Sequence, residues 1–264
     1  MLKINELLNS LETLAPLKIS MSAIEQGSYD NSGLIIKCKE EVSSVLFTLD
    51  LSVESVKKAK NLKCDTIVTH HPAIYAPLKN LSEDSVVSGA VFMAIKSGIN
   101  VISMHLNLDM AKEGIDQCLS NGLGGETVEI LSYVDTEHGY GRIAKIKPIK
   151  FSEFIAKTKK TFDTNKVIFY GNKNANISSV ASFCGSGGSD IEKALKSGRL
   201  DAELVVSSDI PHHVICELLS KGKNVLILTH YANEDYGFKY FYERATKLLG
   251  ESIKTHYFSD KRFK

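Results

Sequence analysis

Short runs of β-branched and aliphatic residues alternate with stretches of helical spacing along most of this 264-residue chain, and no other feature limits its fold as much. The first strand-like runs, each followed by helical spacing, cover residues 45–49, 65–69 and 100–104. Strand–helix alternation is typical of βαβ units, which place functional residues at the carboxyl ends of parallel strands. The sequence therefore predicts an α/β protein with mainly parallel or mixed sheets and a site at strand C-terminal ends.

A glycine-rich loop at residues 122–125 interrupts the alternation and is the best candidate for a domain boundary. Residues 128–148 then resemble antiparallel strands, and a second alternating series follows. Its expected strands cover residues 167–170, 179–183, 203–207 and 225–229, and its expected helices cover 152–160, 191–197, 214–219 and 234–248. We therefore expect a first α/β domain over residues 1–124 and a second over residues 125–221.

Charge and hydropathy exclude several classes of protein. The 32 Lys and Arg residues nearly balance the 31 Asp and Glu residues, so nucleic acid is disfavoured as a partner, although a local basic patch can survive this average. No apolar run approaches the roughly 18 residues that cross a bilayer. Glu6 and Glu12 interrupt the first segment in a way that a signal peptide would not show. We therefore expect no membrane association.

The cysteines indicate in which cell compartment the protein is found. The chain has five of them, scattered and without a close pair. An odd number with no export signal favours reduced thiols and a cytoplasmic location. Cys118 and Cys216 lie on helix faces that we expect to be buried.

Histidine and carboxylate side chains follow three of the expected strands, at the point where each strand ends. They are His70 and His71 after residues 65–69, His105 and Asp109 after residues 100–104, and His230 and Glu234 after residues 225–229. Parallel neighbouring strands bring their carboxyl ends within reach of one another. Imidazole and carboxylate without thiolate are ligands that suit Zn, Fe, Mn or Ni. The three strand ends together therefore favour a metal site.

Each strand end also has an interpretation that needs no metal. One histidine of the His70–His71 pair can lie in the core and the other in solvent, and Asp109 is equally suited to capping the helix that follows. His230 can be a hydrogen-bonded core histidine, and Glu234 gains from the dipole at the start of the last helix. Only the conjunction of the three strand ends favours metal ligation over these separate interpretations.

The number of candidate ligands indicates two ions. His70, His71, Asp109, His230 and Glu234 are more ligands than one catalytic zinc ion normally takes from protein. Two divalent ions about 3.5 Å apart, sharing one carboxylate, would use all five and keep positions for water. Glu234 is the bridging carboxylate that we predict, and metal-dependent hydrolysis is the chemistry that such a pair supports.

The same residues resemble the motifs of a known family. The sequences His-His-Pro at 70–72, His-x-Asn-x-Asp at 105–109 and His-x-x-x-Glu at 230–234 are similar to those of the GTP cyclohydrolase I type 2 homologues, also described as NGG-interacting-factor-three-like proteins. Segments 30–34 and 208–213 are similar to two further motifs of that family. The resemblance runs in order from about residue 30 to residue 240 and covers most of the chain.

The resemblance implies a two-metal site with the five ligands named above and a ring-shaped homohexamer. It also implies two interlaced α/β domains, in which residues 222–264 return to complete the first domain and its metal site. Longer members carry an inserted central domain, for which 264 residues leave no room. The family name suggests hydrolysis of a nucleotide or phosphorylated heterocycle. A metal-storage or metal-delivery protein and a hexameric scaffold without catalysis are the alternatives.

Two further segments carry weaker signals. The loop Cys-Gly-Ser-Gly-Gly-Ser at 184–189 can offer N–H groups to a phosphate or can form a plain tight turn, and Asp190 departs from the dinucleotide fingerprint. Asp209 and His213 are expected to line the cleft as outer partners or acid–base groups, with helix capping an equal alternative for Asp209. His105 is expected to orient a metal ligand.

Overall fold

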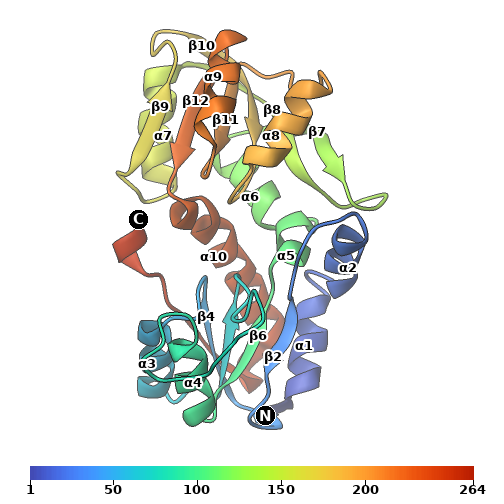
Figure 1. Ribbon diagram of the computed structural model, residues 1–264, viewed down its shortest axis with the longest axis vertical. Helices are drawn as coiled ribbons and strands as arrows, with labels where there is room; N and C mark the ends of the chain where they lie inside the picture. The colour runs from blue at the N-terminus through green and yellow to red at the C-terminus, as the bar shows by residue number, and fades with distance from the viewer. The chain divides into compact units, whose positions relative to one another are not determined.

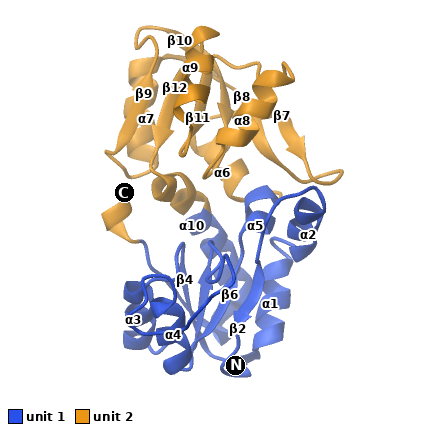
Figure 2. Ribbon diagram, in the orientation of Figure 1, with its two compact units in different colours: residues 1–111, 238–259 blue, residues 112–237, 260–264 orange.

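The computed structural model describes residues 1–264, which divide into two compact units. Unit 1 contains Met1–Ala111 and Phe238–Ser259, and unit 2 contains Lys112–Gly237 and Asp260–Lys264 (Figure 2). Unit 2 thus begins just before helix α6 (Ile115–Gly122), and the predicted domain bounds stay a prediction. Asp116 ties α6 to the rest of unit 2, since its buried carboxylate accepts hydrogen bonds from the backbone amides of Gly141 and Cys184. The second segment of unit 1 begins at Phe238.

A five-stranded sheet in the order β13-β4-β5-β6-β2 forms the centre of unit 1 (Figure 1). Its parallel strands are β4 (Ser44–Thr48), β5 (Thr66–Thr69), β6 (Asn100–Ser103) and β13 (Lys254–Tyr257), and β2 (Gly33–Ile36) runs antiparallel along β6. Thr48, Thr69 and Ser103 pair in register, so β4, β5 and β6 end at one edge of the sheet. All three strands are buried throughout, as continuous apolar runs in parallel sheets usually are.

Helices cover both faces of this sheet. They are α1 (Ile4–Glu12), α2 (Leu17–Glu25), α3 (Val53–Asn61), α4 (Gly89–Lys96), α5 (Leu106–Met110) and the part of α10 (His230–Leu249) from Phe238 onward, with the short strands β1 (Leu2–Lys3) and β3 (Glu41–Val42) and the 3-10 turn η1 (Gly250–Ser252) beside them. Val56 of α3 and Val91 of α4 pack in one core cluster with Ile67 of β5. The ring of Phe241 on α10 lies 6.1 Å from that of Phe47, whose neighbour Leu46 belongs to the first cluster. Because alternate residues of a strand face opposite sides, α10 covers the second face.

A six-stranded mixed sheet in the order β7-β8-β10-β11-β12-β9 forms unit 2. Its strands are β7 (Glu126–Tyr133), β8 (Gly139–Lys150), β9 (Val167–Tyr170), β10 (Asn176–Ser182), β11 (Leu204–Ser207) and β12 (Asn224–Leu228). The central strands β10, β11 and β12 are parallel, whereas β7, β8 and β9 pair antiparallel. The antiparallel strands expected over residues 128–148 are therefore present as β7 and β8.

The helices of unit 2 are α6, α7 (Phe151–Thr161), α8 (Gly188–Lys196), α9 (His212–Ser220) and the start of α10, followed by the 3-10 turn η2 (Lys261–Phe263). Ile191 of α8 and Val214 of α9 pack with Val205 of β11 in the core of the unit. The spacing of buried Ile191, Ala194 and Leu195 gives α8 one apolar face, which explains why this polar segment forms a helix against the sheet. The predicted α/β class with parallel and mixed sheets is confirmed. None of the helices has both the length and the apolar character that a bilayer crossing requires.

Candidate metal centre

His70 lies immediately after β5 and is completely buried. Its Nδ1 atom is 2.8 Å from the backbone carbonyl oxygen of Met104, at the end of the neighbouring strand β6. A carbonyl oxygen only accepts hydrogen bonds, so Nδ1 carries the proton and Nε2 keeps its lone pair. The fold therefore presents His70 in the tautomer that binds a metal through Nε2.

His71 is held in the same tautomer by a carboxylate. Its Nδ1 atom is 2.7 Å from Oδ1 of Asp50, two residues beyond the end of β4. The backbone amide of His71 also donates to the carbonyl of Leu49 at 3.0 Å. The imidazole rings of His70 and His71 lie 4.8 Å apart between centroids, so both histidines occupy one region at the end of the strand. His70 is completely buried, whereas the side chain of His71 is 26% exposed.

His105 and Asp109 bring the next strand end to the same place. His105 precedes the short helix α5, and its ring lies 5.3 Å from the ring of His70. Oδ1 of Asp109 is 3.4 Å from Nε2 of His70, and Asp109 is only 5% exposed. Asp109 does not cap α5, because His105 occupies that position. Ligand atoms of His70, His105 and Asp109 all lie within 4.8 Å of one another, an arrangement that can hold a metal ion.

A buried carboxylate also anchors His105. Its Nδ1 atom is 2.7 Å from Oδ1 of Asp30, whose other oxygen accepts a 2.7 Å hydrogen bond from the Ser32 hydroxyl. Burial raises the pKa of Asp30, but hydrogen bonds from His105, Ser20 and Ser32 outweigh burial, so the pKa lies below its ordinary value. Asp30 therefore stays ionised and keeps the proton of His105 on Nδ1. The prediction that His105 orients a metal ligand stays a prediction, and the structure places His105 beside His70 and Asp109.

His230 and Glu234 form the corresponding pair of unit 2. His230 is the first residue of α10, four positions before the expected start of that helix, so Glu234 lies one turn inside it. Nδ1 of His230 is 2.6 Å from Oδ2 of Asp209, and Nε2 is 3.1 Å from Oε2 of Glu234. Glu234 is only 3% exposed. A residue that served only to open a helix in solvent would be much more exposed. The contact with Asp209 fixes the orientation of the His230 ring, and a role of Asp209 as an outer partner of a metal stays a prediction.

The glycine loop at 184–189 packs directly against this pair. Gly185 has a φ of +53°, and a Cβ atom there would overlap the Oε1 atom of Glu234 and lie 3.3 Å from Nε2 of His230. The amide of Gly185 donates to Oδ1 of Asn233, and the carbonyl of Gly185 accepts from the hydroxyls of Ser207 and Ser208. These bonds are those of a tight turn that supports Glu234, and phosphate binding by the loop stays a prediction. His213 lies elsewhere, exposed and 3.9 Å from Glu192.

The four histidines therefore share one arrangement, in which Nδ1 donates to an oxygen and Nε2 is the remaining ligand atom. Outer oxygen partners of this kind orient metal-binding histidines and raise their basicity. The grouped imidazole and carboxylate side chains could hold a metal ion. Sequence reasoning missed Asp50, although its place directly after a buried strand at the same sheet edge is a signal that could have found it.

Comparison with known proteins places this geometry in context. A sequence model of the Duf34/NIF3 (NGG1p interacting factor 3) family matches residues 2–262. A protein named GTP cyclohydrolase 1 type 2 homolog from Clostridium perfringens is 29% identical over 237 residues, which cover 88% of this chain and 87% of that one. The solved structure of reduced HcgD from Methanocaldococcus jannaschii is 28% identical, with a TM-score of 0.80 and 97% of both chains covered. A Bacillus cereus protein related to NIF3 shares the fold, with a TM-score of 0.85, 18% identity and coverage of 98% of this chain and 97% of that chain.

Proposed function

Because the chain belongs to the Duf34/NIF3 (NGG1p interacting factor 3) family, we propose that it is a two-metal hydrolase that acts on a nucleotide or phosphorylated heterocycle. The observation that carries the proposal is the common orientation of the four histidines, each held at Nδ1 by an oxygen acceptor. His138 has the same kind of contact with Asp135, so the proposal also depends on the grouping of His70, His71 and His105, whose ring centroids lie 4.8 to 5.9 Å apart. The name of the Clostridium perfringens relative, a GTP cyclohydrolase 1 type 2 homolog, supports the substrate class.

The proposed ligands are His70, His71 and Asp109 from unit 1 and His230 and Glu234 from unit 2. Within unit 1, His70 is completely buried and Oδ1 of Asp109 lies 3.4 Å from its Nε2 atom. Within unit 2, Nε2 of His230 lies 3.1 Å from Oε2 of Glu234.

Two divalent ions bound by these residues would supply Lewis-acid chemistry and activate water near neutral pH for attack on a phosphoryl, amidine or similar centre. The chain's own contribution is orientation. Asp50 and Asp209 hold their histidines by hydrogen bonds of 2.7 Å and 2.6 Å, and Gly185 leaves the space that the carboxylate of Glu234 occupies. We propose Glu234 as the bridging carboxylate, since its burial excludes water that would otherwise compete for its oxygens.

We also propose a homohexamer. Exposed apolar side chains on α2, Met21 and Ile24, and on β7, Val128 and Tyr133, support association with further copies. Light scattering is expected to give about six times the 29.1 kDa mass of one chain. A monomer at micromolar concentration contradicts this part of the proposal.

The decisive experiment loads wild-type protein and Glu234→Gln with zinc or manganese alone and screens nucleotides and phosphorylated heterocycles for turnover. We expect wild-type hydrolysis and a loss of about 100-fold or more in the variant, because one uncharged amide oxygen replaces a bridging carboxylate. Glu243→Gln changes an exposed glutamate on the same helix and should keep full activity. Full activity of Glu234→Gln refutes the proposal. Readily exchangeable metal without turnover in the wild type supports storage or delivery instead.

A further inference from the structure

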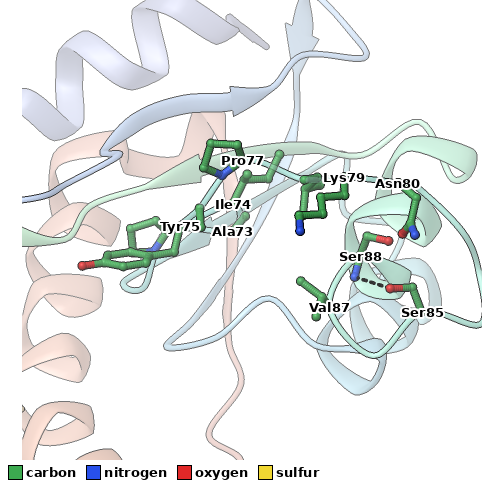
Figure 3. A pocket seen from close by; sticks show the side chains of 12 residues that line it. Ala73, Ile74, Tyr75, Pro77, Lys79, Asn80, Ser85, Val87 and Ser88 are labelled. Carbon is green, nitrogen blue, oxygen red and sulfur yellow. Dashed lines mark hydrogen bonds between the residues drawn. The ribbon is translucent and has the colours of Figure 1, made fainter.

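A pocket of about 620 Å³ lies in unit 1, and its lining begins directly after His70 and His71, which follow β5 (Figure 3). It is built from a single stretch of chain: its lining begins at Pro72 and ends at Ser88. Small-molecule sites typically enclose about 300–1,000 Å³. The pocket therefore has the size of a small-molecule site and is too small to admit a folded partner.

The walls of the pocket combine apolar surface with one cation. Ile74, Pro77 and Leu78 supply apolar surface, and Lys79 is the only charged residue of the lining. In Figure 3 the Lys79 side chain extends toward the space between Ile74 and Val87. No carboxylate of the chain forms an ion pair with Lys79. An unpaired ammonium group beside apolar walls favours a ligand that carries a negative charge.

The pocket is tied to the candidate metal centre at its near end. Nδ2 of Asn31 donates a 2.6 Å hydrogen bond to the carbonyl of Ile74, and the amide of Ala73 donates to the Ser103 hydroxyl at 3.1 Å. Tyr75 lines the pocket, and its ring stands perpendicular to that of His105 at 6.4 Å between centroids. One aromatic side chain therefore belongs to both the pocket and the histidine cluster.

The far end of the pocket is fixed as well. The amide of Ser88 donates to the Ser85 hydroxyl, and the amide of Ser82 donates to the Ser88 hydroxyl. A Cβ atom on Gly89 would lie 2.8 Å from the carbonyl oxygen of Glu83, so this turn packs tightly on the start of α4. Residues 70–88 contain no helix or strand, and connections of this length in a compact unit are usually either functional loops or linkers.

Tyr75 indicates what else the ligand carries. Its side chain is 52% exposed, although an edge-to-face contact with Tyr29 at 4.9 Å holds the ring in place. A fixed, half-exposed aromatic ring beside apolar walls is suited to stacking with another planar ring. The pocket thus offers one surface for a flat ring and one group for an anion.

We propose that this pocket holds the substrate of the metal centre, a small molecule with a planar heterocycle against Tyr75 and an anionic group on Lys79. A nucleoside monophosphate has both parts. The claim that the bound molecule is hydrolysed rests on the proposed function. The claim that the pocket binds a nucleotide depends only on the pocket residues. It makes Lys79 a specificity-determining residue outside the set of metal ligands.

The test measures binding by calorimetry to zinc-loaded protein with three probes: guanosine monophosphate, guanosine and inorganic phosphate. We expect the nucleotide to bind more tightly than either fragment, because only the nucleotide has both the ring and the anion. Lys79→Ala should weaken nucleotide binding about tenfold, as expected for the loss of one charge-assisted hydrogen bond, and leave guanosine binding unchanged. Lys79→Arg should restore most of the affinity. Lys57→Ala, an exposed lysine of α3, is the matched control.

Other outcomes overturn the inference. Equal nucleotide affinity of the wild type and Lys79→Ala, or no binding of any probe at millimolar concentration, excludes the pocket as the substrate site. Binding that depends on Lys79 without hydrolysis leaves the pocket standing and refutes the hydrolase. Turnover that depends on Glu234 but not on Lys79 supports the hydrolase and excludes the pocket as the substrate site. Metal content measured in each variant must equal that of the wild type, since the pocket residues are not proposed ligands.

Discussion

Asp50 accepts a hydrogen bond of 2.7 Å from Nδ1 of His71, although the two residues follow different strands of unit 1. The pairs His105–Asp30 and His230–Asp209 repeat this relationship at 2.7 Å and 2.6 Å. The repetition matters because each carboxylate keeps the proton on Nδ1 and leaves Nε2 as the nitrogen that can bind a metal. Removal of a single carboxylate should therefore weaken metal binding without removing a ligand.

Asp50→Ala is expected to lower metal affinity about 10- to 100-fold, the usual effect of losing an outer partner of a metal-binding histidine. Competition with a chromogenic chelator measures this change directly. Asp50→Asn should lose less, since its amide oxygen can still accept the proton of His71. Glu25→Ala, at an exposed position of α2, is the control. Unchanged affinity in Asp50→Ala would show that His71 is not a ligand.

Gly185→Ala should disrupt the position of Glu234. The added methyl group would overlap a carboxylate oxygen of Glu234, and a φ of +53° costs a residue with a Cβ atom about 1–2 kcal/mol. We expect a lower free energy of unfolding together with reduced metal content. Gly198→Ala is the matched control, because Gly198 has a φ of +71° but open space around its Cβ position. Gly198→Ala should lose only the stability that the positive φ costs, and it should keep its metal. Equal metal content in both variants would contradict the prediction.

Asp30 should make stability depend on pH. Its pKa is lower in the folded protein than the ordinary value of 3.8, so the unfolded chain takes up this proton more readily. The stabilisation is then present in full above about pH 4 and is lost as the pH falls through the folded pKa. Chemical unfolding in the presence of a chelator, from pH 3 to pH 7, measures the effect. The difference between the wild type and Asp30→Asn should be largest near pH 7 and shrink in acid, and a constant difference would rule out the linkage.

The strand ends could be predicted from sequence because they depend on local pattern. The strands ending at Thr69, Ser103 and Leu228 follow from short apolar runs, and polar side chains directly after them mark the sheet edge. The placement of His70 and Asp109 in one region of unit 1 depends only on parallel neighbours with ends in register. Patterns of this kind survive in a single sequence because burial of a central strand demands them.

The partners of the histidines could not be predicted in this way. Asp30 reaches His105 across a separation of 75 residues, which no local periodicity encodes. The start of α10 at His230 also differs from the expected start, because the polar residues of its first turn face unit 2 groups rather than an apolar core. The prediction that Cys118 is buried is confirmed, whereas Cys216 on α9 is exposed, since helical spacing alone does not decide which face meets the sheet.

Asp116 provides a last prediction, about stability of unit 2 rather than metal binding. Its fully buried carboxylate lies 3.5 Å from Nη1 of Arg142, also buried, and accepts backbone hydrogen bonds from Gly141 and Cys184 at 2.9 Å and 3.1 Å. Asp116→Ala leaves a buried guanidinium without its counterion, a change that costs about 3–5 kcal/mol. Denaturant unfolding should show this loss.

The double variant Asp116→Ala/Arg142→Met separates the two causes. It removes the uncompensated charge but not the unpaired amides, so it should recover part of the stability that the single variant loses. Because the amide of Cys184 adjoins Gly185, metal content should fall in both variants if the Cys184 hydrogen bond positions the loop under Glu234. A double variant as unstable as Asp116→Ala would assign the whole cost to the lost backbone hydrogen bonds and none to the charge.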